Sequence, residues 1–394
     1  MSTQVTAAIT PRLSAEEELY WLALRLIPGL GPVKTVRLLE EYHSPQAIFR
    51  ASQSELESFE LSGAVARAIT SGCVFEDALD QQERMRARNV HLIPFGIPPY
   101  PSRLAEIMDA PPVLFAQGRL ELLESIPIAV VGTRRPTPYG IAAAERISAA
   151  LARAGATVLS GMARGIDTAA HRAALQASGN TAAIFGCGID HVYPAENRKL
   201  AEEIAQKGLI LSEFPMATPA HPQNFPVRNR IVSALSYGVL IVEGAQYSGS
   251  TITARLASEQ GREVYAVPGN ITSKMSWVPN LLIKQGAKLV QDAEDILAEL
   301  TSYDRLRLLN FMSCEDTAEG PDKSLQQLEL QLGPRAPLAR RLFDALKIEE
   351  ATQMDSLLES NWDGSPSEVV AALFELEMLG MIRQLPGKQF VRVW

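Results

Sequence analysis

Short apolar runs alternate with amphipathic stretches through the middle of the chain. Apolar runs without polar alternation are typical of strands buried on both faces, and the stretches between them have the spacing of helices. The pattern therefore predicts an α/β domain built on a Rossmann-like, doubly wound parallel sheet. The candidate strands are Pro127–Gly132, Ala156–Gly161, Thr181–Gly186, Leu209–Phe214, Gly238–Glu243, Glu263–Val267 and Ala287–Val290.

The first part of the chain reads as helical, and we expect a small helical domain at residues 14–85. Apolar positions at helical spacing occur in Glu18–Arg25 and Thr35–Tyr42, on either side of the glycine-containing turn Ile27–Lys34. This arrangement resembles a helix-hairpin-helix, whose turn can offer backbone N–H groups to a phosphate. The same turn equally suits a small packing domain.

A proline-rich connector follows. Only His91–Phe95 and Val113–Gln117 in this stretch have the composition of strands. We expect both to extend the sheet at an edge, which gives a sheet domain at residues 86–300.

Beyond residue 300 the pattern becomes polar and irregular, and we expect a linker at residues 301–335. Three candidate helices and a hairpin then predict a winged-helix domain at residues 336–394. The third helix carries Glu368, Glu375 and Glu377 and no Lys or Arg. Such a helix would be repelled by a phosphate-lined groove, so we interpret this domain as a protein-contact module. The elements are Leu338–Leu346, Gln353–Glu359, Ser367–Leu379 and the hairpin Met381–Val393.

Composition excludes several classes of protein. The chain has 394 residues, 46% of them hydrophobic, and a net charge of -8. It has no apolar run approaching the roughly 20 residues of a membrane span and no N-terminal signal pattern, so we expect a cytoplasmic protein. Its three cysteines and five histidines have no metal-ligand spacing, so neither a metal site nor disulfides are indicated.

The charge is unevenly distributed. Residues 127–300 hold 16 Lys and Arg against 14 Asp and Glu, whereas residues 14–80 hold 5 against 11 and residues 336–394 hold 6 against 9. The predicted sheet domain is therefore the relatively basic part of the chain.

Glycines, hydroxyls and arginines follow several of the candidate strands. The stretch Phe225–Ile231 is the most pronounced, with two arginines in a run, Phe214–Val242, that lacks acidic residues. Because parallel strands end at one edge of the sheet, these turns should meet there and form an extended site for a polyanion. The other turns are Gly132-Thr133-Arg134, Ser160–Gly165, Gly186–Gly188, Tyr247–Thr251 and Pro268–Asn270.

Two common nucleotide motifs are missing. The turn after the first strand is not G-x-G-x-x-G, the second strand ends without a ribose-binding carboxylate, and no G-x-x-x-x-G-K-[ST] loop occurs. Mononucleotides and a nucleic-acid backbone remain as ligands.

The ordered motifs resemble the DNA-processing protein family DprA, also called Smf. The resemblance covers roughly Pro94–Val290. It implies a non-enzymatic, cofactor-free, homodimeric protein of natural transformation that binds and protects incoming single-stranded DNA and loads the RecA recombinase onto it. One departure is Trp277-Val278-Pro279 before Asn280, where the family usually has a glycine. The matching motifs are Gly132-Thr133-Arg134, Ser160–Asp167 with Ala170-His171, Gly186–Asp190 with Tyr193–Asn197, Ser212–Pro215, Phe225–Arg230, Val242–Ala245 with Ser248–Ser250, and Gly261–Gly269.

The resemblance and the chemistry of the side chains assign roles in binding a single strand. Arginines would hold phosphates, and glycines and serines would present N–H and hydroxyl donors. Phe225 either stacks on a base or anchors the loop in the core. The expected nucleic-acid-binding residues are Arg134, Ser160, Gly161, Arg164, Gly165, Lys199 as a peripheral cation, Phe225, Arg228, Asn229, Arg230, Ser248, Gly249 and Ser250.

Four acidic or imidazole side chains lie close to these residues, and we expect no catalytic residue among them. Asp167 and His171 have the spacing of an acid–base pair on one helix, but a structural role is favoured for both. Glu213 and Glu243 follow strands and would brace the arginines.

An alternative is a Rossmann-type nucleotide phosphoribohydrolase of the lysine-decarboxylase-like kind. Those enzymes carry a P-G-G-x-G-T loop. The comparable stretch here, Glu243–Thr251, lacks the first two residues of that motif.

Overall fold

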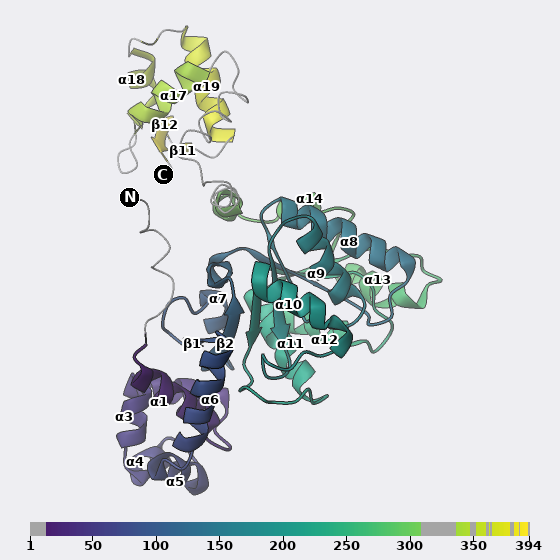
Figure 1. Ribbon diagram of the computed structural model, residues 1–394. Coiled ribbons are helices and arrows are strands. Elements are labelled where there is room, and N and C mark those ends of the chain that lie inside the picture. The colour runs from purple at the N-terminus through teal and green to yellow at the C-terminus, as the bar shows by residue number, and fades with distance from the viewer. Residues whose placement is uncertain are drawn as a thin grey trace. The chain divides into compact units, whose positions relative to one another are not determined.

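The computed structural model describes residues 13–308, 336–346, 352–359, 362, 365–378, 382–385 and 387–392. The chain divides after Leu300 into two compact units (Figure 1).

The first unit begins with six helices. Serines cap four of them: Ser14 and Ser52 each form a capping box with a glutamate, and Ser44 and Ser62 each accept a backbone N–H. The sequence pattern indicated helices here but did not separate α3 to α5, because each is too short for a clear apolar period. The helices are α1 (Ala15–Leu26), α2 (Pro32–Tyr42), α3 (Pro45–Arg50), α4 (Gln53–Ser58), α5 (Gly63–Ser71) and α6 (Phe75–Ala87).

The predicted strands form one large sheet, in the order β1-β2-β6-β5-β4-β3-β7-β8-β9. All strands from β3 to β9 pair in parallel, which confirms the doubly wound sheet. Nearly all side chains of β3 to β7 are buried, as runs without polar alternation require. The strands are β3 (Pro127–Val131), β4 (Thr157–Ser160), β5 (Thr181–Phe185), β6 (Leu209–Ser212), β7 (Gly238–Ile241), β8 (Glu263–Ala266) and β9 (Lys288–Leu289).

The proline-rich connector extends this sheet, as predicted. Strand β1 (His91–Pro94) pairs antiparallel with β2 (Val113–Gly118), and β2 pairs antiparallel with β6. A short helix, α7 (Ser102–Ala105), and a 3-10 helix, η1 (Leu120–Glu124), lie in the same connector.

The strand order reverses between β3 and β7. Helices α8, α9 and α10 pack beside β3 to β6, and α11 and α12 pack against each other on the chain's return to β7 and β8. Right-handed crossovers put these two groups on opposite faces of the sheet. A ligand site is expected where the order reverses, beyond the strands' carboxyl ends. The helices are α8 (Pro138–Arg153), α9 (Ile166–Gln176), α10 (Arg198–Lys207), α11 (Asn224–Leu235), α12 (Gly249–Glu259), α13 (Trp277–Lys284) and α14 (Glu294–Leu297), with 3-10 helices η2 (Ala195–Asn197) and η3 (Lys274–Ser276).

The N-terminal helices share a core with the edge of the sheet. Leu22 and Ile69 belong to the same buried cluster as Phe115 of β2 and Ile210 of β6. The amide of Gln81 also exchanges two hydrogen bonds with the backbone of Met216, at 2.7 and 3.3 Å. These contacts hold the helical segment and the sheet together in one unit.

The second unit begins with a helix at residues 302–308. The prediction of an irregular linker was wrong for these residues. The Oγ1 of Thr301 accepts the N–H of Asp304 at 3.1 Å and donates to its carboxylate at 2.6 Å. This cap begins a helix in a stretch whose polar composition favoured an irregular segment. The rest of the predicted linker, 309–335, lies outside the described residues.

The winged-helix prediction is confirmed. Three helices pack around a small core that includes Leu342 and Leu376. The predicted hairpin pairs as β11 (Ile382–Leu385) and β12 (Gln389–Arg392), and β10 (Thr352–Gln353), which was not predicted, adds a third strand. The helices are α17 (Ala336–Ala345), α18 (Met354–Glu359) and α19 (Pro366–Met378).

No helix in the described parts of either unit combines the length and the apolar character that a membrane span needs.

Candidate nucleic-acid interface

An open pocket of about 590 Å³ lies where the strand order reverses. Its wall comes from the end of β3 and the turn that follows it, from α11, from the start of α12 and from Met275 of η3. Seven of the expected binding residues line it: Arg134, Phe225, Arg228, Asn229, Ser248, Gly249 and Ser250.

Aromatic rings and arginines meet on one side of this pocket. The half-buried ring of Phe225 lies 5.2 Å from the ring of Tyr193, measured between centroids. The guanidinium carbon of Arg134 lies 5.5 Å from the Phe225 centroid, and that of Arg228 lies 6.0 Å from it. A ring flanked by cations can stack on a base while the arginines bind the adjoining phosphates.

Arg228 lies beneath this surface and is only 4% exposed. Its Nε has no hydrogen-bond partner among the described residues. Burial lowers the pKa of Arg228, and the charge of Asp167 opposes that shift. Asp167 is therefore the countercharge for a buried cation at the floor of the pocket.

Asp167 also fixes the loop between β4 and α9. Its Oδ2 accepts the backbone N–H groups of Gly161 at 3.1 Å and Ala163 at 3.3 Å. Burial raises the pKa of Asp167, whereas Arg228 and these two N–H groups favour the carboxylate. The predicted structural role of Asp167 agrees with these contacts.

Two glycines allow neighbouring groups to approach the backbone closely. A Cβ on Gly161 would lie 1.4 Å from an Arg228 nitrogen, so only glycine leaves space for the buried guanidinium. Gly165 has a φ of +79°, and a Cβ there would lie 2.4 Å from the carbonyl oxygen of Thr133. Both residues support the pocket from below without lining it.

The first turn of α12 forms the opposite wall. Ser248 is the N-cap residue, but its side chain does not cap the helix. Its hydroxyl is hydrogen-bonded instead to that of Ser250. These two hydroxyls and the positive end of an 11-residue helix suit an anion.

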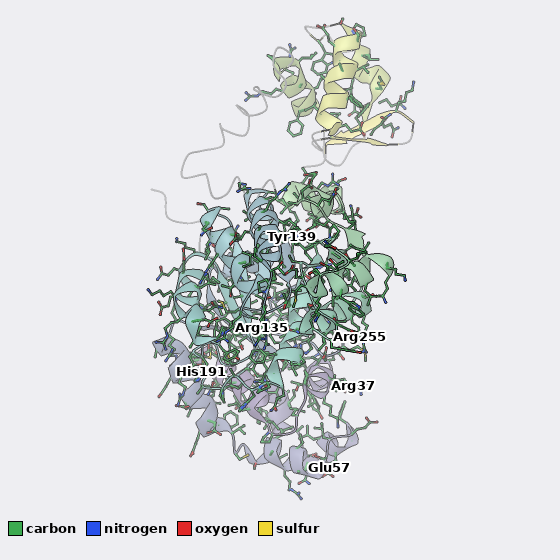
Figure 2. All side chains as sticks on the ribbon, turned by 90° about the vertical axis from the view of Figure 1, so that its right-hand side faces the viewer. Arg37, Glu57, Arg135, Tyr139, His191 and Arg255 are labelled. Carbon is green, nitrogen blue, oxygen red and sulfur yellow. The ribbon has the colours of Figure 1, made fainter. Side chains whose placement is uncertain are left out.

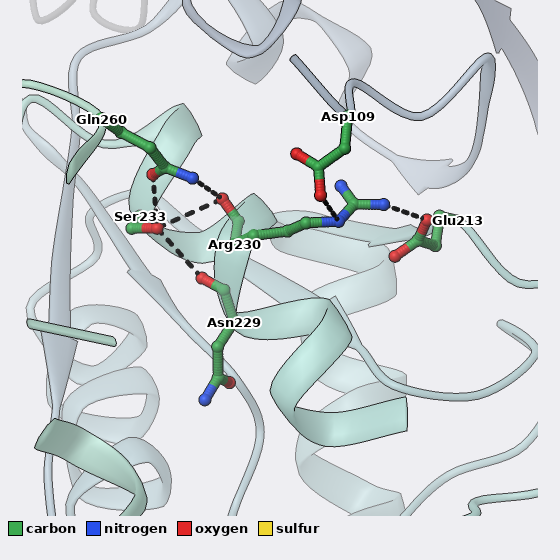
Figure 3. A network of polar contacts seen from close by, with 6 residues as sticks. All are labelled: Asp109, Glu213, Asn229, Arg230, Ser233 and Gln260. Carbon is green, nitrogen blue, oxygen red and sulfur yellow. Dashed lines mark hydrogen bonds and ion pairs between the residues drawn. The ribbon is translucent and has the colours of Figure 1, made fainter. Parts of the chain in front are cut away.

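Arg230 is held away from the pocket. Its guanidinium is ion-paired with Glu213 at 2.6 Å and with Asp109 at 3.1 Å (Figure 3). The side chains of Arg230 and Glu213 are only 8% and 6% exposed. Glu213 therefore braces an arginine, as predicted, and Arg230 connects α11 to β6 and to the connector.

Three further expected residues also lie outside the pocket lining. Ser160 is buried, and its hydroxyl donates to the carbonyl of Val130 at 2.7 Å. Arg164 is exposed and pairs with Glu196 at 2.8 Å. Lys199 is an exposed residue of α10.

His171 and Glu243 have structural partners. Thr181 donates its hydroxyl to Val158, so the Nδ1 of His171, 2.7 Å away, must donate to Thr181. Burial lowers the pKa of His171 to about 3, which keeps the ring neutral. Glu243 pairs with no arginine among the described residues: its carboxylate accepts the N–H and the hydroxyl of Thr137, the N-cap residue of α8.

Several residues of the pocket lining were not among the expected binding residues, including Arg135, Tyr193 and Thr253. Arg135, labelled in Figure 2, and Tyr193 are exposed, and Thr253 is buried in α12. The position of Arg135 directly after Arg134 in the sequence could have indicated that it also binds the ligand. The pairing of Tyr193 with Phe225 had no signal in sequence spacing.

The fold and the pocket together define a class of protein. It is a Rossmann-like α/β protein with a cationic, aromatic-lined pocket at the reversal of strand order, followed by a winged helix.

Comparison with known proteins gives the family. The family model described as DNA recombination-mediator protein A matches residues 91–301, and the DprA winged helix domain matches residues 326–388. The chain is 41% identical over 300 residues to protein Smf of Escherichia coli K12, covering 76% of each chain. It is 33% identical over 403 residues to protein Smf of Synechocystis, covering 96% of this chain and 100% of that one.

A solved structure supports the same family. The X-ray structure of DNA processing protein A from Streptococcus pneumoniae matches with a TM-score of 0.62 and 33% identity, covering 72% of this chain and 98% of that one. The chain therefore belongs to the DprA/Smf family of DNA-processing proteins.

The first prediction concerns Arg230. Arg230→Ala should lower the free energy of unfolding by about 3–5 kcal/mol, because it leaves the buried carboxylate of Glu213 without its ion-pair partner. Chemical denaturation measures the loss. The exposed Arg134→Ala is the matched control and should change stability by less than about 0.5 kcal/mol. Equal stability of the two variants would show that the Arg230–Glu213 pair does not brace the fold.

The second prediction concerns Arg228. Arg228→Ala should raise the pKa of Asp167 further. A carboxyl whose pKa is higher in the folded than in the unfolded state costs stability at pH values above the unfolded-state pKa. The loss relative to wild type should be roughly 1–3 kcal/mol at pH 7 and smaller at pH 4.

Adding Asp167→Asn to Arg228→Ala should recover part of the loss at pH 7, because the amide carries no charge. Denaturation at both pH values checks this. A loss independent of pH would mean that Asp167 is not the countercharge.

Proposed function

We propose that this chain binds single-stranded DNA in the pocket between β3 and β7 and acts, as a homodimer, to protect incoming strands and load the RecA recombinase onto them during natural transformation. The observation that carries the proposal is the grouping of Arg134, Arg228, Phe225 and Tyr193 around one open pocket. Membership of a family described as a recombination mediator supports the role downstream of binding.

The chemistry of the pocket favours an unpaired strand over a duplex. Phe225 and Tyr193 offer ring faces to bases, and a base can stack on a side chain only when it is free of its own stack. The arginines and the first turn of α12 bind phosphate whatever the sequence. The pocket should therefore bind single strands with little sequence preference.

The burial and hydrogen bonding of the acidic side chains favour DNA binding over nucleotide hydrolysis. Glu243, which begins the stretch comparable to the phosphoribohydrolase loop, is 2% exposed and its carboxylate is engaged by Thr137. Asp167 is 5% exposed and engaged by backbone N–H groups. Neither carboxylate is placed to activate water. An assay of base release from nucleoside monophosphates separates the two functions.

The third prediction is a salt dependence. Affinity for a single-stranded oligonucleotide should fall with salt, with a log–log slope of about -0.7 for each phosphate contact, and duplex should bind much more weakly. Arg134→Ala should make the slope shallower by about 0.7, since it removes one contact. Gel-shift titrations over a salt series measure both, and equal affinity for duplex would refute the proposal.

The fourth prediction separates the two units. A chain ending at Leu300 should fold, because residues up to Leu300 form a compact unit. It should bind single-stranded DNA within a few-fold of the full chain, because residues 336–394 carry 6 basic against 9 acidic side chains.

Circular dichroism and the same titrations test this truncation. A hundredfold loss of affinity with an intact fold would show that the winged helix binds DNA.

A further inference from the structure

Two loops beside the pocket carry large apolar side chains that are almost fully exposed. Tyr247, between β7 and α12, is 92% exposed, and Ile271, in the loop after β8, is 91% exposed. Within the described residues they are the two most exposed large apolar side chains. Exposed apolar side chains on loops beside a pocket are candidate contacts for a ligand that extends beyond it.

The two loops are fixed to each other at their bases. The N–H of Gly244 donates to the carbonyl of Met275 at 2.7 Å, and the N–H of Val278 donates to the carbonyl of Gly244 at 2.9 Å. The side-chain amide of Asn280 binds both the N–H and the carbonyl of Gly269. Because Met275 lines the pocket, both loops lie at its rim.

The backbone holds the ring of Tyr247 out of the core. Tyr247 has a φ of +66°, a left-handed conformation that is disfavoured for a bulky side chain. The next residue, Ser248, is the N-cap of α12 and lines the pocket. An aromatic residue is thus kept at the pocket rim in a conformation that glycine would adopt more easily.

A cation lies on the adjoining loop. Lys274 is exposed and begins η3, directly before Met275. Tyr247 and Lys274 therefore repeat the combination of aromatic ring and cation that lines the pocket itself. Proteins bind successive nucleotides of a single strand with such repeated combinations.

We propose that Tyr247 and Lys274 form an outer subsite for single-stranded DNA, in which a base of the strand leaving the pocket stacks on Tyr247 and an adjoining phosphate binds Lys274. This inference rests on the proposed function and adds the direction in which the strand leaves.

The test compares oligothymidylates of two lengths, about 4 and about 15 nucleotides, the range of single-strand site sizes. With the full-length protein, Tyr247→Ala should weaken binding of the longer strand about tenfold, as expected for losing one stacked base, and leave the shorter one nearly unchanged. Fluorescence anisotropy gives the affinities.

Conservative variants separate stacking from general apolar contact. Tyr247→Phe and Tyr247→Trp should retain the affinity of wild type, whereas Tyr247→Leu should lose as much as Tyr247→Ala. Lys274→Gln should make the salt slope of the longer strand shallower by about 0.7. Met108→Ala, at an 84% exposed side chain on a different cavity, is the control and should change nothing.

Failure of this inference is distinct from failure of the proposed function. No binding of either strand by wild type would overturn the proposed function. Binding of both strands, weakened by Arg134→Ala but not by Tyr247→Ala, would overturn only the outer subsite. A Tyr247→Leu variant as good as wild type would exclude stacking. A change of molecular mass in light scattering with Tyr247→Ala would assign the ring to a contact between copies of the chain, and would also overturn the subsite.

Discussion

The candidate site depends on one buried electrostatic interaction, that between Asp167 and Arg228. Both side chains are almost completely buried, and isolated charges cannot be buried at this depth without compensation. Asp167 provides that compensation and also gathers the N–H groups of Gly161 and Ala163. One carboxylate therefore sets the path of the β4–α9 loop and permits a cation to form the floor of the pocket.

Arg228 and Arg230 have different roles because of their positions on the helix. Residues two apart on a helix point in nearly opposite directions. Arg228 faces Asp167 and the pocket, whereas Arg230 faces Glu213 and Asp109 on the far side of α11. A short cationic run thus supplies one arginine to the ligand site and one to the ion pairs that hold the helix in place. The same ion pairs position Asn229 and Phe225 indirectly, because they fix the helix that carries them.

The sheet was predictable from sequence because its strands are buried on both faces, which leaves uninterrupted apolar runs such as Pro127–Val131. Short elements were not predictable in the same way. The helix at 302–308 depends on the cap formed by Thr301 and Asp304, which composition alone does not indicate.

The types of residue that follow the strands could be predicted from the sequence, but the contacts between their side chains could not. The sequence shows that arginines follow the strands, yet only the fold brings Asp109 and Glu213 to Arg230 and Tyr193 to Phe225. Even the nearest of these partners in sequence, Glu213, is 17 residues from the arginine it contacts. Long-range pairing of this kind leaves no periodic signal in the chain.

Hydrogen–deuterium exchange with and without a single-stranded oligonucleotide tests whether the strand binds in this pocket, because the exchange rate reports where the strand covers the backbone. Binding there should slow exchange in peptides spanning residues 132–136, 224–229 and 246–252, which line or adjoin the pocket. Peptides of the winged helix around α19 should be unchanged. Protection confined to α19, with the pocket peptides exchanging as fast as in the free protein, would contradict binding in the pocket.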